Sequence, residues 1–384
     1  MQFKSVIGHP ELKERLINMV QSGRVSHAQL FLGDFGYGGL GLAIAYAQYI
    51  FCSNRTATDS CGDCPSCLKV SKLAHPDLHF SYPFNARGKS TLANTTSDEF
   101  AKEWRELVVE SPYFKLANWQ SKMEIEQKKP IINVKESQSI INKLSLKSYE
   151  ASYKVMIIWD AEQMNVEAAN KLLKLIEEPT AKTIILLLAE NQENILQTIL
   201  SRTQIIRIPP IDTAVLQLSL REEGCDETQA SRFSKLAEGN YLTAKGYLEH
   251  EEEEVLFFEL FKSWMRACWK ADIQAMHGWV EEASSAKLGR EGRKRFLIYA
   301  LELMREGVLM GYTGDQLRRF FGEEGAFMEN FAPFVHTENI VDLMEMLNEA
   351  HYHIDRNAYA KIVFMDMSMK FANLLRVKKR TFVS

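Results

Sequence analysis

The feature that most constrains the fold of this 384-residue chain is a regular alternation of strand-like and helical segments over its first 210 residues. The strand-like segments are short runs rich in β-branched and aromatic residues, as expected for parallel strands that are buried on both faces. Five strands are predicted, at residues 29–32, 77–81, 154–159, 183–189 and 204–208. This alternation predicts an α/β fold, a parallel five-stranded sheet with helices on both faces.

The clearest helical pattern between the strands spans residues 161–178, where apolar side chains recur at three- to four-residue spacing. Pro179 follows directly and disfavours helical conformation in the residue before it. We therefore expect an amphipathic helix that ends at this proline. Residues 82–130, in contrast, read as polar and irregular, and we expect a long loop there, of a role that the sequence does not give.

Pro209-Pro210 ends the alternation, and no convincing strand pattern follows it. The length of the chain also favours two or three domains. We predict an α/β domain at residues 1–210, a small helical domain at 211–250 and a larger helical domain at 251–384. Six residues are expected in the core of the last domain: Trp264, Trp269, Phe296, Leu303, Phe327 and Phe364.

The composition narrows the class of protein further. No apolar run approaches the roughly 18 residues that a membrane helix needs, and the first residues lack the apolar core of a secretory signal. We therefore expect a cytoplasmic protein with no membrane partner. The formal net charge of −4 disfavours a protein that holds nucleic acid mainly through its own electrostatics.

A glycine-rich segment, residues 33–40, lies between the first predicted strand and the next helix, the position of a Walker A loop, Gly-x4-Gly-Lys-Ser/Thr. The glycines that the tight turn needs are present, as Gly33, Gly36 and Gly38. Gly39, however, stands where a lysine would contact the β- and γ-phosphates, and Leu40 stands where a hydroxyl would bind magnesium. We expect no ATP at this degenerate loop. The alternative is a glycine-rich turn that never belonged to a nucleotide-binding fold.

The strand predicted at 154–159 resembles a Walker B strand, which in an active enzyme ends in Asp-Glu, one carboxylate for magnesium and one to activate water. Trp159 occupies the magnesium position here, with Asp160 after it, and tryptophan does not ligate metals. In the other register Asp160 takes the magnesium position, but Ala161 then leaves the water-activating acid missing. Either register is defective for hydrolysis.

Four of the six cysteines crowd into residues 52–67, as Cys52, Cys61, Cys64 and Cys67. In a cytoplasmic chain such crowding favours a metal over disulfides, and the Cys-x2-Cys spacing lets two ligands of one loop reach one ion. We predict a structural zinc site, since four thiolates leave no open coordination position. Free buried cysteines or a redox pair are the alternatives. His75 and His79 are not expected to be ligands, because Pro76 and the strand after it carry them away.

Further motifs carry a family resemblance. They are residues 6–10 (Val-Ile-Gly-His-Pro), 24–28 (Arg-Val-Ser-His-Ala), 75–77 (His-Pro-Asp), 168–179 ending Glu-Glu-Pro, and 200–203 (Leu-Ser-Arg-Thr), with a weaker match at 357–363. Together with the glycine-rich segment and the cysteines, they make the chain similar to the delta-prime subunits of the bacterial DNA polymerase III clamp loader, in the AAA+ clamp-loader family. The resemblance is good for about 1–80 and 130–245 and thin from there to the final helices.

The resemblance implies an AAA+ P-loop core, a small helical lid domain and an all-α C-terminal domain through which subunits assemble into a collar. It implies a non-hydrolysing stator subunit of DNA replication that assembles with ATP-hydrolysing tau/gamma subunits and a delta subunit to load the sliding clamp on primer-template DNA. Arg202 matches the arginine finger that such subunits supply in trans to a neighbour's ATP, although Thr203 replaces the cysteine usual after it. A sensor-two arginine is missing at 239–242. The family often carries a zinc module of this kind.

Two other functions stay open. One is an active AAA+ ATPase motor like the tau/gamma subunits, against which Gly39, Leu40 and Trp159 speak. The other is a zinc-containing DNA-binding protein outside replication, which the negative net charge disfavours. For Arg202 itself, the alternative to a finger is a surface residue that caps a helix.

Overall fold

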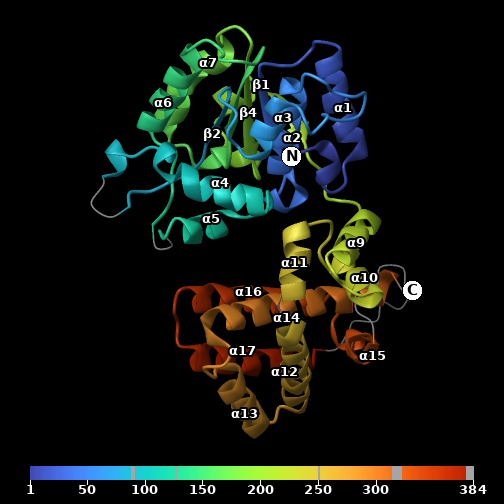
Figure 1. Cartoon of the computed structure of the whole chain (residues 1–384). Helices are drawn as coiled ribbons and strands as arrows, with labels where there is room; N and C mark the ends of the chain where they lie inside the picture. The colour runs from blue at the N-terminus through green and yellow to red at the C-terminus, as the bar shows by residue number, and fades with distance from the viewer. Residues whose placement is uncertain (88–90, 126–127, 250, 314–321, 378–384) are drawn as a thin grey trace. The chain divides into compact units, whose positions relative to one another are not determined.

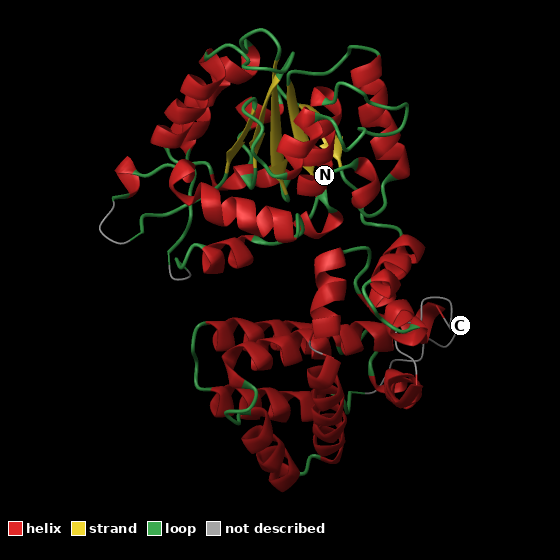
Figure 2. Ribbon diagram, in the orientation of Figure 1, coloured by secondary structure: helices red, strands yellow, loops and turns green. Residues whose placement is uncertain are grey.

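The computed structural model of the protein describes residues 1–87, 91–125, 128–249, 251–313 and 322–377. The chain divides into two compact units, Met1–Gly246 and Tyr247–Ser384 (Figure 1). The first unit contains the sheet, and the described part of the second is helical (Figure 2). The finer division into three domains stays a prediction.

The sheet of the first unit has five strands in the order β2-β3-β4-β1-β5, and every pair of neighbours is parallel. The strands are β1 (Ala28–Leu32), β2 (Leu78–Ser81), β3 (Lys154–Ile158), β4 (Thr183–Ala189) and β5 (Gln204–Arg207). The predicted fold class is confirmed, and each strand begins and ends within one residue of its predicted bounds. Parallel strands of this kind need helices on both faces to bury them.

Helices cover both faces of the sheet, and on each face the side chains of helices and strands form one apolar cluster. On one face lie α1 (Pro10–Gln21), α2 (Gly39–Phe51), α4 (Ala101–Glu110) and α5 (Leu116–Lys122), with the short α3 (Pro65–Ser71) packed beside α2. On the other lie α6 (Val134–Ser145), α7 (Val166–Glu177) and α8 (Gln197–Leu200). Strand β3 shows the alternation directly, because Val155 and Ile157 join the first cluster while Met156 and Ile158 join the second.

The helix predicted at 161–178 is shorter than expected at its start. Residues Ala161–Gln163 form a 3-10 turn, and α7 begins only at Val166. Asn165 caps the helix, since its side-chain oxygen accepts a hydrogen bond from the Ala168 N–H at 2.8 Å. The apolar spacing therefore predicted the helix correctly but ran through a capping residue, and the prediction of its start was wrong.

The prediction of a long irregular loop at 82–130 was also wrong. The segment contains α4, α5 and two 3-10 turns, η3 (Leu92–Asn94) and η4 (Ser97–Phe100). Its aromatic side chains join the first apolar cluster, in which Tyr82 stacks on Trp104 at 4.1 Å and Trp119 lies edge-on to Trp104 at 5.3 Å. The Trp119 indole N–H donates to the Pro83 carbonyl at 2.7 Å. A few widely spaced large rings supply this burial, so no run of apolar residues signals it.

After β5 the described chain is helical, as predicted. The first unit ends with α9 (Thr213–Glu222), α10 (Glu227–Leu236) and the start of α11 (Tyr241–Glu249). The second contains α12 (Glu251–Lys270), α13 (Ile273–Ala283), α14 (Gly289–Thr313), α15 (Gly322–Phe331), the 3-10 turn η8 (Ala332–Phe334), α16 (Ile340–Asp355) and α17 (Ala360–Leu374). No helix within the described ranges has the length and apolar character that crossing a bilayer requires.

The core of the second unit forms around Trp264, which is fully buried, stacks on Trp279 at 4.9 Å and donates its indole N–H to Ser368 at 2.9 Å. Of the six predicted core residues, Trp264, Phe296, Leu303 and Phe364 are buried and Phe327 is half-buried. Trp269 is 45% exposed, so that prediction was wrong. Five positions along a helix turn the side chain by about 140°, and α12 therefore cannot direct both tryptophans into one core.

Replacing Trp264 with alanine should lower the free energy of unfolding by about 3–5 kcal/mol, because it leaves a large cavity and removes the hydrogen bond from the indole N–H to the Ser368 hydroxyl. Chemical denaturation followed by circular dichroism measures the loss. Trp269→Ala is the matched control and should cost a third of that or less. Equal losses for the two variants would contradict this view of the core.

Candidate functional site

The glycine-rich segment lies between β1 and α2, as predicted. Residues Phe35–Tyr37 form a 3-10 turn, and Gly38 then has a φ of +89°, a backbone conformation that favours glycine. Leu40, at the position of the magnesium-binding hydroxyl, is 2% exposed and belongs to the core. A Cβ atom on Gly36 would meet the Asn240 Oδ1 atom at 1.9 Å, so the start of α11, where no sensor-two arginine stands, lies directly against this turn.

The backbone N–H groups of this turn are bound by acceptors of the chain itself. The Phe35 N–H donates to the Glu190 carboxylate at 3.1 Å, and the Gly36 N–H donates to the Asp34 carboxylate at 2.7 Å. The next two N–H groups bond to carbonyls of the same turn. In a Walker A loop these groups cradle phosphate oxygens. Two carboxylates of the protein thus take the place of a bound anion.

A second feature covers the turn, and we call residues 111–115, between α4 and α5, the cover segment. Four of its side chains contact the nucleotide-loop region: Pro112 at Gly41, Tyr113 at Gly38, Phe114 at Trp159 (ring centroids 4.9 Å apart) and Lys115 at Asp34 (3.7 Å). Tyr113 is 7% exposed, and its hydroxyl accepts a hydrogen bond from the Ile7 N–H at 3.0 Å. Sequence reasoning missed this segment, although the run Pro-Tyr-Phe at 112–114 was a signal of burial.

The Walker B position is filled by aromatic packing. Trp159 is fully buried, with ring centroids of Phe35 and Phe114 each 4.9 Å away and that of Trp104 at 5.4 Å. Asp160, which follows it, is 3% exposed and has a φ of +52°. Burial first, and the nearby Glu162 charge second, raise the pKa of Asp160 to about 7. The carboxylate stands beside no compensating cation in the described part of the chain.

The four cysteines come together, as the sequence predicted. Cys52 directly follows α2, Cys61 lies between α2 and α3, Cys64 directly precedes α3, and Cys67 lies within α3. All four Sγ atoms lie within 4.8 Å of one another, with three of the separations at 3.5, 3.9 and 4.0 Å. Tetrahedral zinc with Zn–S bonds of about 2.3 Å places its sulfurs about 3.8 Å apart. The donor set and its spacing therefore fit such an ion.

The electrostatics of the cluster agree with this fit. Burial raises the pKa of the Cys52 and Cys67 thiols, so these sulfurs favour the protonated form when no cation lies among them. A divalent metal would supply the missing charge and hold the thiolates. Backbone N–H groups also point at sulfur, from Cys61 to Cys52 at 3.3 Å and from Cys64 to Cys61 at 3.4 Å.

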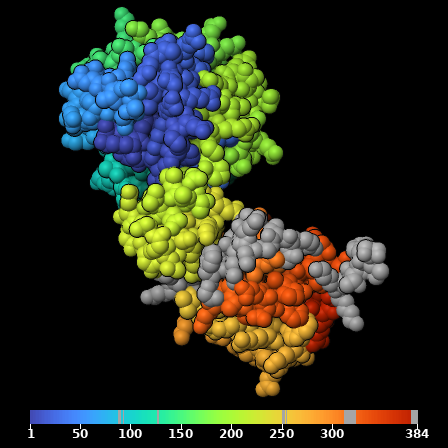
Figure 3. Space-filling model, turned by 90° about the vertical axis from the view of Figure 1, so that its right-hand side faces the viewer, coloured from blue at the N-terminus to red at the C-terminus, as the bar shows by residue number. Residues whose placement is uncertain are grey.

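The cysteine segment is tied to the start of the chain. The Asp59 carboxylate accepts hydrogen bonds from the N–H groups of Phe3 and Lys4, both at 3.0 Å, and the Gln2 side chain donates to the Ser60 carbonyl at 2.5 Å. The two segments, dark and lighter blue, adjoin on the surface in Figure 3. A metal at the cysteines would therefore order the N-terminal turn as well as its own loop.

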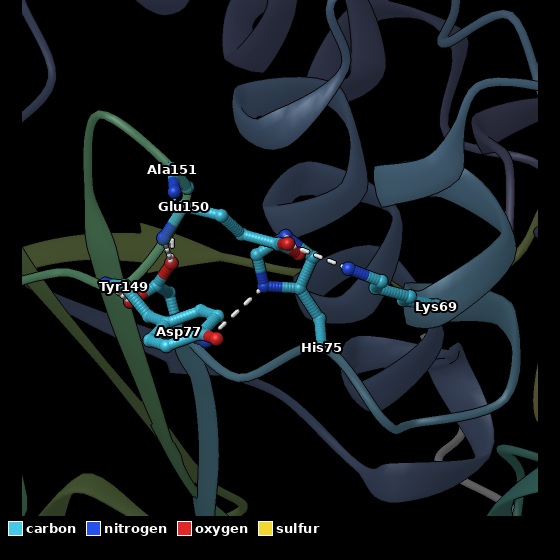
Figure 4. A network of polar contacts seen from close by, with 6 residues as sticks. All are labelled: Lys69, His75, Asp77, Tyr149, Glu150 and Ala151. Carbon is cyan, nitrogen blue, oxygen red and sulfur yellow. Dashed lines mark hydrogen bonds and ion pairs between the residues drawn. The ribbon is translucent and has the colours of Figure 1, made fainter.

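His75 belongs to a separate polar network, as expected of a residue outside the metal site (Figure 4). Its Nε2 atom lies 3.2 Å from the Glu150 carboxylate, which also pairs with Lys69 of α3 at 2.5 Å. Asp77 accepts hydrogen bonds from three consecutive N–H groups, those of residues 149–151, at 2.6–2.9 Å. The network joins α3 to the segments that precede β2 and β3, so its role is structural.

Arg202 lies on the surface, after α8 and before β5. Its Nε atom pairs with the Glu177 carboxylate at 3.2 Å, and its Nη1 atom donates to the Thr198 carbonyl at 3.1 Å and the Ser201 hydroxyl at 3.3 Å. The side chain thus caps the end of α8, which is the alternative to an arginine finger that the sequence left open. It is also 34% exposed and within reach of another molecule.

Arg202 and the glycine-rich segment lie at opposite edges of the sheet. Strands β1 and β5 are parallel, with Gln29 opposite Gln204 and Leu32 opposite Arg207. Arg202 precedes β5, whereas the glycine-rich segment follows β1. Five residues of strand separate the two edges by about 16 Å. The guanidinium therefore cannot reach a phosphate on its own chain's loop.

Comparisons with known proteins identify the family of the chain. The family profile described as "DNA polymerase III, delta subunit" matches residues 8–212, more than half of the chain. The DNA polymerase III subunit delta' of Bacillus subtilis (strain 168) is 26% identical over 273 residues, which are 67% of this chain and 69% of that protein. The subunit delta' of Escherichia coli (strain K12) is 27% identical over 54% of this chain and 50% of that protein.

A tau subunit is a more remote relative. The subunit tau of Bacillus subtilis (strain 168) is 23% identical over 203 residues, 53% of this chain and 28% of that protein. The chain therefore spans about half or less of two of these three relatives.

Asp160→Asn should stabilise the protein, and more so at high pH. The folded pKa of Asp160 lies above the unfolded value of about 3.9. Its ionisation therefore costs folding free energy as the pH rises from about 4 to 7. The advantage of the asparagine variant should grow by about 1–3 kcal/mol between pH 5 and pH 8. Urea unfolding at the two pH values measures this change in the free energy of unfolding. Asp212→Asn, at an exposed carboxylate that caps α9, is the control. If the advantage of Asp160→Asn were the same at both pH values, the burial argument would be contradicted.

Proposed function

Because this chain belongs to the delta-prime subunits of the DNA polymerase III clamp loader, we propose that it serves DNA replication as the subunit that does not hydrolyse ATP. In this role it assembles in the cytoplasm with tau/gamma and delta subunits, which load the sliding clamp on primer-template DNA. Its second, helical unit provides the assembly contacts as a collar domain, and α9–α11 correspond to the lid. Arg202 completes the ATP site of a neighbouring motor subunit.

The observation that carries the proposal is that carboxylates of the chain itself bind backbone N–H groups of the glycine-rich turn. Asp34 and Glu190 already bind two N–H groups of this turn, those of Phe35 and Gly36, and both carboxylates repel a triphosphate. Tyr113 of the cover segment stands against Gly38, at the end of the turn. The positions of the phosphate-binding lysine and the magnesium-binding hydroxyl hold Gly39 and Leu40. An incoming ATP would have to displace these groups, and the loop lacks the lysine and the magnesium-binding hydroxyl that would offset the cost.

The same observation disfavours the alternative of an active motor. A motor needs a carboxylate at the end of β3 to hold magnesium, and the fully buried Trp159 stands there, packed by rings on three sides. Repair of one position would leave the others defective. The alternative of a zinc-containing DNA-binding protein draws no support from the family to which the chain belongs.

In this proposal Cys52, Cys61, Cys64 and Cys67 hold a structural zinc ion. Four thiolates complete a tetrahedron and leave no position for water or substrate, so the ion supplies folding energy rather than chemistry. The bonds of Asp59 and Ser60 to residues 2–4 extend the effect to the N-terminal turn. That turn leads to Ile7, whose N–H binds Tyr113 of the cover segment.

Arg202 acts in trans in this proposal, as an arginine finger. A guanidinium is planar and permanently charged, and it stabilises the charge that develops on a transferring γ-phosphoryl group. The exposure of Arg202 and its distance from the chain's own loop both favour a neighbour's nucleotide as its target.

An ATP titration tests the central claim. Magnesium and 1 mM ATP should raise the melting temperature of the purified chain by less than about 1 °C, because no binding free energy is gained. Differential scanning fluorimetry measures the shift, with a motor subunit as the positive control. A rise of several degrees in the melting temperature would contradict the proposal that the chain does not hydrolyse ATP.

Metal analysis tests the cysteine site. The chain purified under reducing conditions should contain about one equivalent of zinc, and Cys64→Ser should lose it while speeding amide exchange at residues 1–4 and 52–67. Cys225→Ser, a buried cysteine outside the cluster, is the matched control and should keep the metal. Less than about half an equivalent in the wild-type protein would contradict a tight four-thiolate site.

Arg202→Ala should leave the fold and the assembly intact but slow ATP turnover of the reconstituted complex with clamp and primed DNA. Arginine fingers contribute about 10³–10⁵ in rate at one site, so a loss of tenfold or more at that site is expected. Arg207→Ala is the matched control, an exposed arginine on β5 that bonds only to Gln192 among the described residues. Unchanged turnover would remove the finger from the proposal.

A further inference from the structure

Two of the three guanidinium nitrogens of Arg202, Nε and Nη1, are hydrogen-bonded to acceptors of the same chain. The Nε atom donates to Glu177, and the Nη1 atom donates to Thr198 and Ser201. Within the described residues no acceptor lies at hydrogen-bonding distance from the Nη2 atom. Of the five N–H donors of arginine, the two on Nη2 thus remain free for an external ligand.

Glu177 is the one side-chain carboxylate in this arrangement, and it stands on a rigid element. It is the last residue of α7, which is capped by Asn165 and buried against the sheet through Leu172 and Ile176. The backbone that carries the Glu177 carboxylate is therefore held in place, while Arg202 lies in the short connection between α8 and β5. A charged group on a packed helix can set the direction of a long, flexible side chain.

The ion pair is too exposed to matter much for stability. The side chain of Arg202 is 34% exposed and that of Glu177 is 57% exposed, and exposed pairs of this kind contribute little to folding. Its effect lies in orientation, because an unrestrained arginine loses rotamer entropy when a phosphate fixes it. A guanidinium that is already oriented loses less on meeting its target.

We infer that Glu177 is a positioning residue for Arg202, which directs the free Nη2 edge of the guanidinium toward the γ-phosphate on a neighbouring subunit. This inference rests on the proposed role of Arg202 in trans. It assigns Glu177 a part in the turnover of a nucleotide that its own chain does not bind. The carboxylate acts through the arginine and touches no phosphate itself.

The neighbouring residue supplies a matched control. Glu178 has the same side chain, is exposed, and forms no side-chain hydrogen bond or ion pair among the described residues. A general loss of negative charge on this face of the subunit would affect both positions. An effect through Arg202 would appear only at Glu177.

The test uses the reconstituted clamp loader with clamp and primed DNA, and compares Glu177→Ala, Glu177→Gln, Glu178→Ala, Arg202→Ala and the double variant Glu177→Ala/Arg202→Ala. Glu177→Ala should lower kcat about five- to tenfold with little change in KM for ATP, since the finger acts on charge that develops in the transition state. Glu177→Gln should restore part of the rate, because its amide oxygen still accepts the Nε–H bond. Glu178→Ala should behave as wild type.

The double variant decides whether Glu177 acts through Arg202. Its turnover should equal that of Arg202→Ala alone, as expected for two residues that work as one unit. A further loss in the double variant, or wild-type turnover in Glu177→Ala beside a slow Arg202→Ala, would overturn the positioning role and leave the finger intact. Unchanged turnover in Arg202→Ala would instead remove the proposed function at this site. Size-exclusion chromatography checks assembly, and a Glu177→Ala subunit that fails to join the complex would also overturn the inference.

Discussion

The pairing of Asp34 and Glu190 with the N–H groups of the turn after β1 is the interaction on which the rest of this site depends. A turn of this shape concentrates N–H groups that need an acceptor, and nucleotide-binding proteins leave that acceptor to a phosphate. Here two carboxylates of the chain supply it. The turn is therefore complete without a ligand, and the cover segment can close over it with apolar rings.

The core beside this turn is aromatic. Trp159 is a large ring at the end of β3, and the rings of Trp104 from α4 and Phe114 from the cover segment pack against it. The described part of residues 82–130 thereby extends the hydrophobic core along this edge of the sheet. Asp160 is left in that setting as a carboxylate without a cation, which explains its raised pKa.

The functional groups of the first unit lie at separate places, and this separation suits a subunit that acts on its neighbours. The filled nucleotide loop lies at the carboxyl edge of the sheet, Arg202 at the opposite edge, and the cysteine cluster beyond the end of α2. An intact catalytic site would bring such groups together. In the proposed ring, Arg202 and Glu177 serve one neighbour while the chain's own site stays closed.

The sequence by itself determined the parallel sheet, because five short apolar runs alternate with helical patterns, and it determined the cysteine cluster, because local spacing brings its ligands together. It also marked the missing lysine and hydroxyl at Gly39 and Leu40. Only the tertiary structure decided which groups of the chain contact the glycine-rich turn and Arg202. Glu190, Tyr113 and Glu177 reach their partners Phe35, Ile7 and Arg202 across long stretches of chain. No local period or motif encodes such pairings, since they arise when distant elements pack on the same sheet.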